Sequence, residues 1–229
     1  IDVATGAQRL EENLLSLPGG LPLTFRLRYH SLLLRDGVFG RGWEDPTYQA
    51  RLRFLPQGGV LVQWSENRYN LFERQVDGSY RATHGSCRFD SLVQTATGGF
   101  TLTRNGSLVY QFDTQGLLTT LGNAQGQVLQ MSYDSQGRLT QVTDPLTSHY
   151  LVYSYNQENL VTTVNDSAGR SVQLGYDTQR HLTTVMNAVG QTTTYTYNDH
   201  SQLLMATDAD GSQRFRNTYD DQYRIASQD

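Results

Sequence analysis

The second half of the chain repeats itself at a fixed interval, and this feature constrains the fold more than any other. An aromatic residue followed by Asp or Asn occurs six times, in steps of 21, 22, 21, 21 and 22 residues. Such a period is typical of architectures that stack one small unit many times. We therefore expect residues 108–229 to form six tandem copies of one unit. The repeat anchors are Phe112-Asp113, Tyr133-Asp134, Tyr155-Asn156, Tyr176-Asp177, Tyr197-Asn198 and Tyr219-Asp220.

Within each copy the pattern predicts a β-hairpin. Apolar residues stand two and four positions before most anchors, as Met131 and Leu129 do before Tyr133, and the positions between them are largely polar. Alternation with period two indicates a strand with one apolar and one wet face. The turn Asp134-Ser-Gln-Gly137 then offers an Asp that can cap it and a Gly that is free to take positive φ. Each copy is therefore expected to be a hairpin about a tight turn.

The returning strand of each copy has an irregular spacing. An aliphatic residue stands six positions after every anchor and another nine positions after it in four copies, as Leu118 and Leu121 do after Phe112. A spacing of three places two side chains on opposite faces of an ideal strand, so we expect a bulge or short bend between them. Copies three and five lack the turn Gly and have Asn159 and Ser201 at or near its place. Clusters such as 123–126 and 208–211 separate successive hairpins.

The first 107 residues have no clean period, yet they also predict β structure. Leu23 to Tyr29 alternate apolar and polar side chains, which favours a strand. A short helical turn is expected over 9–15, and the glycines of 37–42 predict a tight turn that packs Trp43 inward. The sequence thus predicts a β-rich region over 1–107, followed by the repeats over 108–229. Further strands are expected over 51–55, 60–64, 68–73, 88–93 and 100–103.

Composition excludes several classes of function. The 18 basic residues are all Arg, so phosphate-loop and lysine-nucleophile chemistry are excluded. A net charge of -4 argues against a nucleic-acid surface, and no apolar stretch approaches the length of a membrane span. Cys87 is the single cysteine and cannot form an internal disulfide. The five histidines have no second ligand at metal-binding spacing, so no catalytic, cofactor-binding or metal residue is predicted.

Two other functions remain open at this stage. The abundant tyrosines could form a carbohydrate-binding or adhesion surface through Tyr153 and Tyr195, although cross-strand packing explains their regular occurrence better. A β-helical polysaccharide lyase or hydrolase would need paired carboxylates in one groove, whereas the repeat-phased Asp residues stand in turns. We therefore expect a protein that is not an enzyme.

Two sets of motifs resemble one known family. The line from Tyr133 to Asp144 resembles the repeat of the YD-repeat, or Rhs, family almost residue for residue. The N-terminal stretches 2–6, 17–23 and 28–31, followed by Gly40-Arg-Gly-Trp43, resemble the segment that precedes these repeats in Rhs proteins. The resemblance extends over essentially the whole chain. It assigns a structural role to Pro18, Gly19, Pro22, Tyr29, Gly40, Gly42 and Trp43.

The resemblance implies that the chain is part of a protein shell that encloses another domain. In Rhs proteins many such hairpins form one long curved antiparallel sheet that closes into a hollow β-shell around a C-terminal toxin domain. It implies that this chain is a non-catalytic segment of a bacterial polymorphic toxin, delivered in interbacterial competition by type VI secretion. The implied partners are the remaining shell repeats and the toxin domain, with a secretion spike protein and a chaperone as further candidates. The implied location is the bacterial cytoplasm before export and the exterior or a target cell afterwards.

Overall fold

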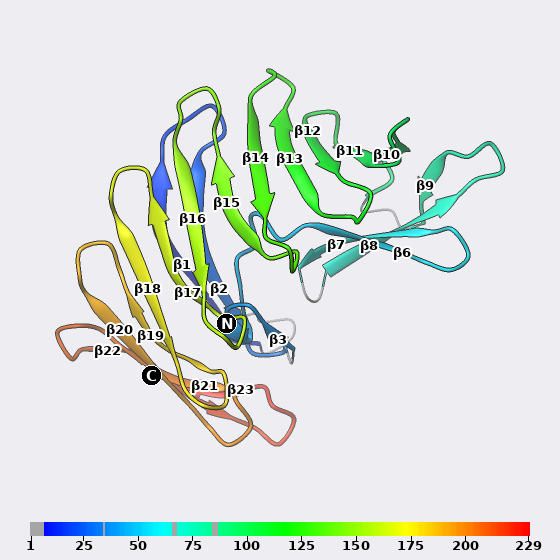
Figure 1. The fold of residues 1–229 in the computed structure, drawn as a ribbon. Helices are drawn as coiled ribbons and strands as arrows, with labels where there is room; N and C mark the ends of the chain where they lie inside the picture. The colour runs from blue at the N-terminus through cyan, green and yellow to red at the C-terminus, as the bar shows by residue number, and fades with distance from the viewer. Residues whose placement is uncertain (1–6, 34, 66–67, 84–86) are drawn as a thin grey trace. The chain divides into compact units, whose positions relative to one another are not determined.

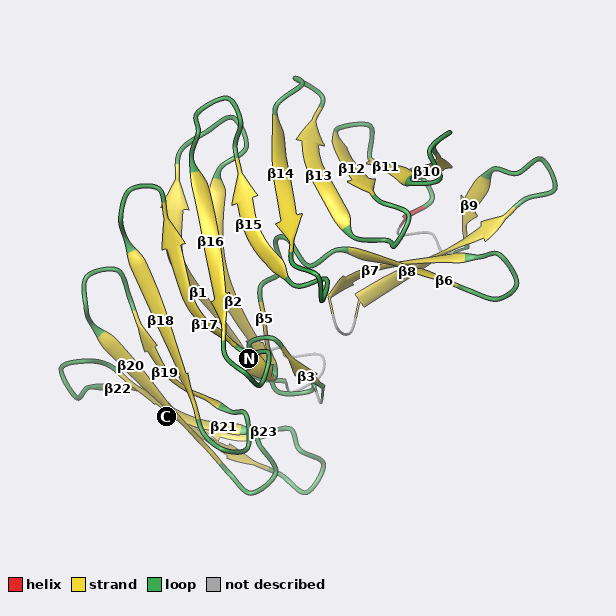
Figure 2. Ribbon diagram, viewed as in Figure 1, coloured by secondary structure: helices red, strands yellow, loops and turns green. Residues whose placement is uncertain are grey.

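The computed structural model describes residues 7–33, 35–65, 68–83 and 87–229. They form two compact units: the first comprises the described residues of Ile1–Ser16, Thr24–Asp45 and Val152–Asp229, and the second those of Leu17–Leu23 and Pro46–Leu151. In the described residues the regular structure consists of β-strands, apart from a 3₁₀ assignment at Cys87 (Figure 2). The prediction of an all-β fold of antiparallel hairpins is confirmed. The predicted motif 2–6 lies outside the described residues, as does His84.

The second unit is a run of antiparallel strands in which each strand pairs with the next along the chain (Figure 1). Short turns connect these strands, and Gly58, Gly78 and Gly98 supply positive φ in three of them. The strands are β6 (Arg51–Phe54), β7 (Val60–Ser65), β8 (Arg68–Arg74), β9 (Tyr80–Ala82), β10 (Ser91–Gln94), β11 (Phe100–Arg104), β12 (Leu108–Phe112), β13 (Leu118–Asn123), β14 (Val128–Tyr133) and β15 (Leu139–Thr143).

A seam in the second unit joins its first strand to the first repeat turn. The Leu52 N–H donates to the Gly116 carbonyl at 2.9 Å, and Arg51 forms an isolated antiparallel bridge with Leu117. Inward-facing aromatic side chains fill the interior, where the rings of Trp64 and Tyr110 meet edge-on with centroids 5.2 Å apart. The turn of repeat one therefore protects part of the β6 edge, which would otherwise present unpaired backbone groups.

The first unit combines a small N-terminal sheet with the later repeats. β2 pairs with β5 in a three-stranded sheet of order β1-β2-β5, and β3 pairs with β4 in a short hairpin. The later hairpins again pair in chain order. The strands are β1 (Arg9–Leu17), β2 (Leu23–His30), β3 (Asp36–Gly37), β4 (Gly40–Arg41), β5 (Trp43–Glu44), β16 (Tyr150–Tyr155), β17 (Val161–Asp166), β18 (Ser171–Tyr176), β19 (Leu182–Met186), β20 (Thr192–Tyr197), β21 (Leu203–Thr207), β22 (Gln213–Tyr219) and β23 (Ile225–Gln228); β1, β2 and β16 run across the boundary between the units.

The N-terminal sheet packs on the apolar face of the later repeats. In Figure 1 the blue strands β1 and β2 run alongside β16 to β18. Phe25 meets Tyr153 edge-on with ring centroids 6.0 Å apart, and Trp43 meets Tyr195 at 5.0 Å. Trp43 is 1% exposed, so the predicted inward packing of this side chain is confirmed. Aromatic contacts of this kind add to the free energy gained by removing apolar surface from water.

Two local predictions in the N-terminal region were wrong. Residues 9–15 belong to strand β1 and form no helical turn, because pairing with β2 and packing on the repeats outweigh the helix propensity of Leu and Glu. The strand predicted from Arg88 begins at Ser91, since 88–90 form a turn in which the Asp90 N–H donates to the Cys87 carbonyl. The short strands β3, β4, β5 and β9 were not predicted, because a strand of two or three residues has no readable period.

The bulge predicted in the returning strand is confirmed. Tyr133 pairs with Leu139 and Ser132 with Gln141, which leaves Thr140 as an extra residue. The same shift occurs at Phe112, Tyr176, Tyr197 and Tyr219. It brings the residues six and nine positions after the anchor to one face, and in repeat four both Leu182 and Val185 are buried.

Candidate functional site

The side chain of the second anchor residue organises the hairpin turn. In every copy its Oδ1 accepts two backbone hydrogen bonds, from the residues two and four positions later, at 2.8 to 3.0 Å. Asp and Asn serve equally because both present an Oδ1 acceptor. The turn therefore does not depend on a charge at this position. The acceptors are Asp113, Asp134, Asn156, Asp177, Asn198 and Asp220.

A second bond closes the turn, and its chemistry follows the anchor. Asp134 accepts from the Arg138 guanidinium at 2.6 Å and Asp220 from Arg224 at 2.8 Å, whereas Asn198 donates to Gln202 at 2.9 Å. Hydrogen bonding from the Arg138 backbone and side chain holds the pKa of Asp134 below its usual range. The bond from Arg224 does the same for the pKa of Asp220.

Four repeats place a residue other than glycine in the left-handed region of the turn. The sequence pattern indicated this for copies three and five, but copies four and six are also of this kind, because Arg180 and Tyr223 have φ of 66° and 62°. Both side chains contact the preceding repeat turn: Arg180 Nη1 donates to the Glu158 carbonyl at 2.9 Å, and Tyr223 packs against His200. These contacts offset the cost of the left-handed conformation.

Four anchor tyrosines connect their repeat to the one before it. The Tyr133 hydroxyl donates to the Leu118 carbonyl at 2.8 Å, and Tyr176, Tyr197 and Tyr219 make the same bond to Val161, Leu182 and Leu203 at 2.7 to 2.8 Å. Burial raises the pKa of Tyr219 to about 12 and that of Tyr176 and Tyr197 further above the ordinary value. These hydroxyls stay protonated and keep donating. Phe112 begins the series and has no hydroxyl.

A threonine at the bulge also stabilises the repeat, and sequence reasoning missed it. The hydroxyls of Thr119, Thr140, Thr162 and Thr183 donate to the carbonyl of the residue before the anchor at 3.1 to 3.4 Å. Each of these threonines stands seven positions after its anchor. That recurrence was available in the sequence, and it marks the residue that the bulge leaves unpaired.

Three of the predicted N-terminal motif residues, Tyr29, Gly40 and Trp43, meet the later repeats in the first unit. Trp43 Nε1 donates to the Tyr197 hydroxyl at 2.8 Å, and the Leu203 N–H donates to the Tyr29 hydroxyl at 3.0 Å. Gly40 and Gly42 both have positive φ. A Cβ at Gly40 would lie 2.4 Å from the Arg180 carbonyl oxygen, so this close backbone approach requires glycine.

Three other motif residues lie in the loop between β1 and β2, in the second unit. The Pro18 carbonyl is 3.1 Å from His149 Nδ1, and a Cβ at Gly19 would lie 3.0 Å from Asp144 Oδ2. Pro22 is exposed just before β2. Pro18 and Gly19 therefore approach the turn that ends repeat two, whereas Tyr29, Gly40 and Trp43 contact later repeats and Gly42 lies against Tyr29 and His30.

The carbohydrate-binding surface considered for Tyr153 and Tyr195 was wrong. The two side chains are only 4% and 3% exposed beneath the N-terminal sheet. The Tyr153 hydroxyl donates to the buried Asp45 carboxylate at 3.4 Å. Side chains in this position cannot stack on a sugar from solvent, and the aromatic face instead forms the core of the first unit.

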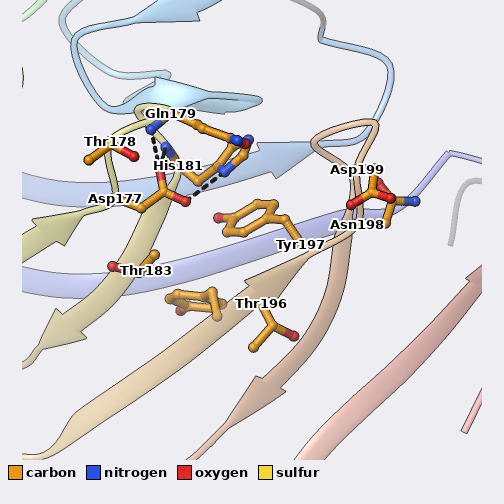
Figure 3. Close-up of a pocket in the computed structure, with 10 residues that line it drawn as sticks. Asp177, Thr178, Gln179, His181, Thr183, Thr196, Tyr197, Asn198 and Asp199 are labelled. Atoms are coloured by element: carbon orange, nitrogen blue, oxygen red, sulfur yellow. Dashed lines mark hydrogen bonds and ion pairs between the residues drawn. The ribbon is translucent and has the colours of Figure 1, made fainter.

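A depression of about 470 Å³ lies between the anchor turns of repeats four and five (Figure 3). In it, Asp177 accepts from the His181 backbone at 2.9 Å and is 2.8 Å from His181 Nδ1, while the His181 ring stacks on Tyr197 at 4.6 Å. Burial raises the pKa of Asp177, but the hydrogen bonds from His181 outweigh it and hold that pKa below its usual range. His181 Nε2 is buried without a hydrogen-bond partner among the described residues, so no hydroxyl occupies the position of an activated nucleophile there. His181 takes the place that Arg138 and Arg224 hold in their turns.

The described part of the chain contains no group of three or more His, Cys, Asp or Glu side chains placed to hold a metal ion. Among the same residues, no helix has the length and apolar character needed to cross a membrane.

Two family models match the chain. The first, described as a domain of unknown function (DUF6531), matches residues 1–72, and the second, described as the RHS Repeat, matches residues 102–149 and 180–213. The first match contains the N-terminal sheet, and the second covers the turns of repeats one, two and five. A comparison with curated proteins gave no match.

Solved structures of Tc toxins are similar over most of this chain. A Tc holotoxin pore of Photorhabdus luminescens with a mutated TccC3 has 11% identity and a TM-score of 0.46, over 96% of this chain and 14% of that chain. A crystal structure of TcdB2-TccC3-Cdc42 has 13% identity and a TM-score of 0.44, over 97% of this chain and 15% of that chain. The chain thus spans a small part of these proteins. With a match to the RHS Repeat over the YD hairpins and a second match over the N-terminal segment, the chain belongs to the Rhs/YD-repeat family.

Proposed function

We propose that this chain is a non-catalytic wall segment of an Rhs toxin shell. In this role residues 108–229 supply six shell repeats, and residues 1–107 form the region that begins the shell. The anchor residues and the N-terminal motif residues act structurally, by holding turns and joining neighbouring repeats. The wall would enclose a C-terminal toxin domain and keep it from the producing cell until delivery.

The observation that carries this proposal is the bond between successive repeats. The anchor hydroxyl of one hairpin donates to a carbonyl of the previous hairpin, and the same geometry recurs through the series. A hairpin of about twenty residues cannot bury its apolar face alone, so such units are stable as a continuous wall. Polar side chains of the turns form hydrogen bonds inside their own turn, as Arg138 does with Asp134, and so stabilise the hairpin itself.

The delivery route is part of the same proposal. We infer export from the bacterial cytoplasm to a target cell by a type VI secretion apparatus in interbacterial competition, with a spike protein and a chaperone as partners. The family membership supports a secreted toxin in general terms. The specific route rests on the resemblance of the N-terminal segment to Rhs proteins.

A protease-protection experiment on the full-length gene product tests the proposal. If these residues form the wall, the C-terminal domain resists protease in the intact protein, and cryo-EM places residues 1–229 in an enclosing layer. Replacing Tyr197 and Tyr219 by Phe removes two bonds between repeats and should speed cleavage of the enclosed domain. The control Tyr69→Phe changes a side chain that is 65% exposed and should leave protection intact. A segment that is detached from the C-terminal domain would refute the proposal.

A further inference from the structure

Two positions of repeat six differ in chemistry from the same positions of the other repeats. Asn217 stands two positions before the anchor and Gln228 nine positions after it. In repeats one to five the same positions carry side chains that pack in the core, and none of them is an amide. Those residues are Tyr110, Met131, Tyr153, Leu174 and Tyr195 at the first position, and Leu121, Val142, Val164, Val185 and Ala206 at the second.

These two amides bind each other and the N-terminal segment. Gln228 Nε2 donates to Asn217 Oδ1 at 2.9 Å and to Gln8 Oε1 at 3.2 Å. Asn217 Nδ2 donates to the Leu203 carbonyl at 2.9 Å. Asn217 is 2% exposed and Gln8 is 3% exposed, so these two amides have given up water for their partners, whereas Gln228, which bonds both, is exposed.

The backbone of Gln8 is also hydrogen-bonded, to Ser31. Its N–H donates to Ser31 Oγ at 3.0 Å, and its carbonyl accepts from the Ser31 N–H at 3.1 Å. Gln8 and Ser31 stand just outside β1 and β2, so this pairing ties the amide to the position of the N-terminal sheet. Gln8, at the end of that sheet, thus bonds to the repeat that carries amides at these two positions.

The apolar contacts of this sheet do not by themselves set its position, and the polar contacts that can do so are the bonds of Tyr29 and Trp43 to repeat five and the amides at Gln8. A strand that shifts by two residues presents the same face, so Leu23, Phe25 and Leu27 would exchange places on the core. Arg214 pairs with Glu12 through a long and partly exposed side chain, which can follow such a shift. A buried amide that loses its partner cannot follow, because it then pays for desolvation without a hydrogen bond.

We propose that Asn217 and Gln228 form the recognition site for Gln8, and that this amide cluster, together with the bonds of Tyr29 and Trp43, determines the register in which the N-terminal sheet binds the repeats. Buried polar residues fix register in other assemblies by the same physical means. The sixth repeat is then the specificity-determining partner of the N-terminal segment. This role does not depend on what the complete protein encloses.

Spin-label distances in the full chain test this register. The labels are placed at Asn13→Cys and Gln222→Cys, both exposed and both in the first unit, with Cys87→Ser as background. The parent protein should give one narrow distance distribution. In the double variant Asn217→Leu/Gln228→Val we expect a second population, displaced by about 7 Å, which corresponds to a slip of two residues. One narrow and unchanged distribution in this variant would overturn the proposal.

Two further variants complete the design. Leu174→Met/Val185→Ile changes the corresponding positions of repeat four and should keep one narrow distribution. Gln8→Leu alters the cluster from the N-terminal side and leaves repeat six unchanged, so it supplies the same test if the double variant does not fold. We expect Gln8→Leu to produce the second population as well. A single narrow distribution in Gln8→Leu would also contradict the proposal.

Discussion

At the scale of single residues, the repeat separates what a turn requires from what it tolerates. The Oδ1 acceptor is present in all six anchors, while the charge is present in four, since Asn156 and Asn198 are amides. In four turns the bond across the turn adapts to this choice, with Arg or His opposite Asp and Gln opposite Asn, while repeats one and three have Leu at that position. Turn geometry and turn electrostatics are therefore separable by mutation.

Asp134→Asn should preserve the hairpin and remove its dependence on acid. The amide keeps the Oδ1 acceptor, as Asn156 does, and loses the ion pair with Arg138. We expect a small change in the urea unfolding midpoint at pH 7 and a weaker fall of that midpoint between pH 5 and pH 3. Asp134→Ala removes the acceptor as well and should unfold at a clearly lower urea concentration at both ends of that range. Equal midpoints for the Asn and Ala variants would contradict this role of Oδ1.

Tyr197→Phe should destabilise the protein more than Tyr133→Phe does. The Tyr197 hydroxyl bonds both the Leu182 carbonyl and Trp43 Nε1, so its removal leaves a buried acceptor and a buried donor without partners. We expect a loss of about 2–4 kcal/mol in the free energy of unfolding, against about 1 kcal/mol for Tyr133→Phe, which loses one bond. Chemical unfolding followed by tryptophan fluorescence measures both. Similar losses would show that the Trp43 bond adds nothing.

At the scale of elements, strands that follow from a local sequence pattern could be predicted, whereas strands that depend on long-range contacts could not. The repeat hairpins and their bulges could be predicted, because period and turn chemistry are local properties of the sequence. Strand β1 could not be predicted, because its residues favour a helix. Contacts with residues far along the chain, such as the ion pair between Glu12 and Arg214, outweigh that preference. The positions of Tyr29 and Trp43 on repeat five were unpredictable for the same reason.

The seam between β6 and repeat one gives a prediction at this scale. Gly116 has φ of 82°, and a Cβ there would lie 2.5 Å from the Leu52 carbonyl oxygen. Gly169 has φ of 78° in an equivalent turn and open space around it. Gly116→Ala should therefore lower the free energy of unfolding by about 1–3 kcal/mol more than Gly169→Ala, which carries the conformational cost alone. Equal losses in urea unfolding would indicate that the seam opens without penalty.

At the scale of the whole molecule, several carboxylates make stability depend on acid. The pKa values of Asp134, Asp177 and Asp220 lie below their ordinary value of 3.8 in the folded protein. A lowered pKa stabilises the folded state above the unfolded value, and this contribution is lost as the pH falls through the folded one. We expect the urea midpoint to fall as the pH is lowered below about 4. A midpoint that is constant from pH 5 to pH 3 would contradict this linkage.

Glu12 should act in the opposite direction. Burial raises the pKa of Glu12 above its ordinary value of 4.5 despite the nearby Arg214. Its contribution is therefore full at low pH and is lost as the pH rises through the folded pKa. Glu12→Gln removes this contribution, so its unfolding midpoint should fall more steeply than that of the parent as the solution is acidified from pH 6 to pH 4. A parallel decline in the two proteins would exclude this role of Glu12.

The direction of the tyrosine bonds has a consequence for how the protein is made on the ribosome. Four anchor hydroxyls each reach back 15 or 16 residues to a carbonyl that has already been synthesised, so these repeats can dock on their predecessors as soon as they emerge. Gln8 is made before all six repeats, yet its partner Gln228 lies 220 positions later. At cellular rates of synthesis this is a delay on the order of 10–40 s. Repeat docking can thus keep pace with translation, whereas the N-terminal segment completes its contacts only after the sixth repeat has been translated.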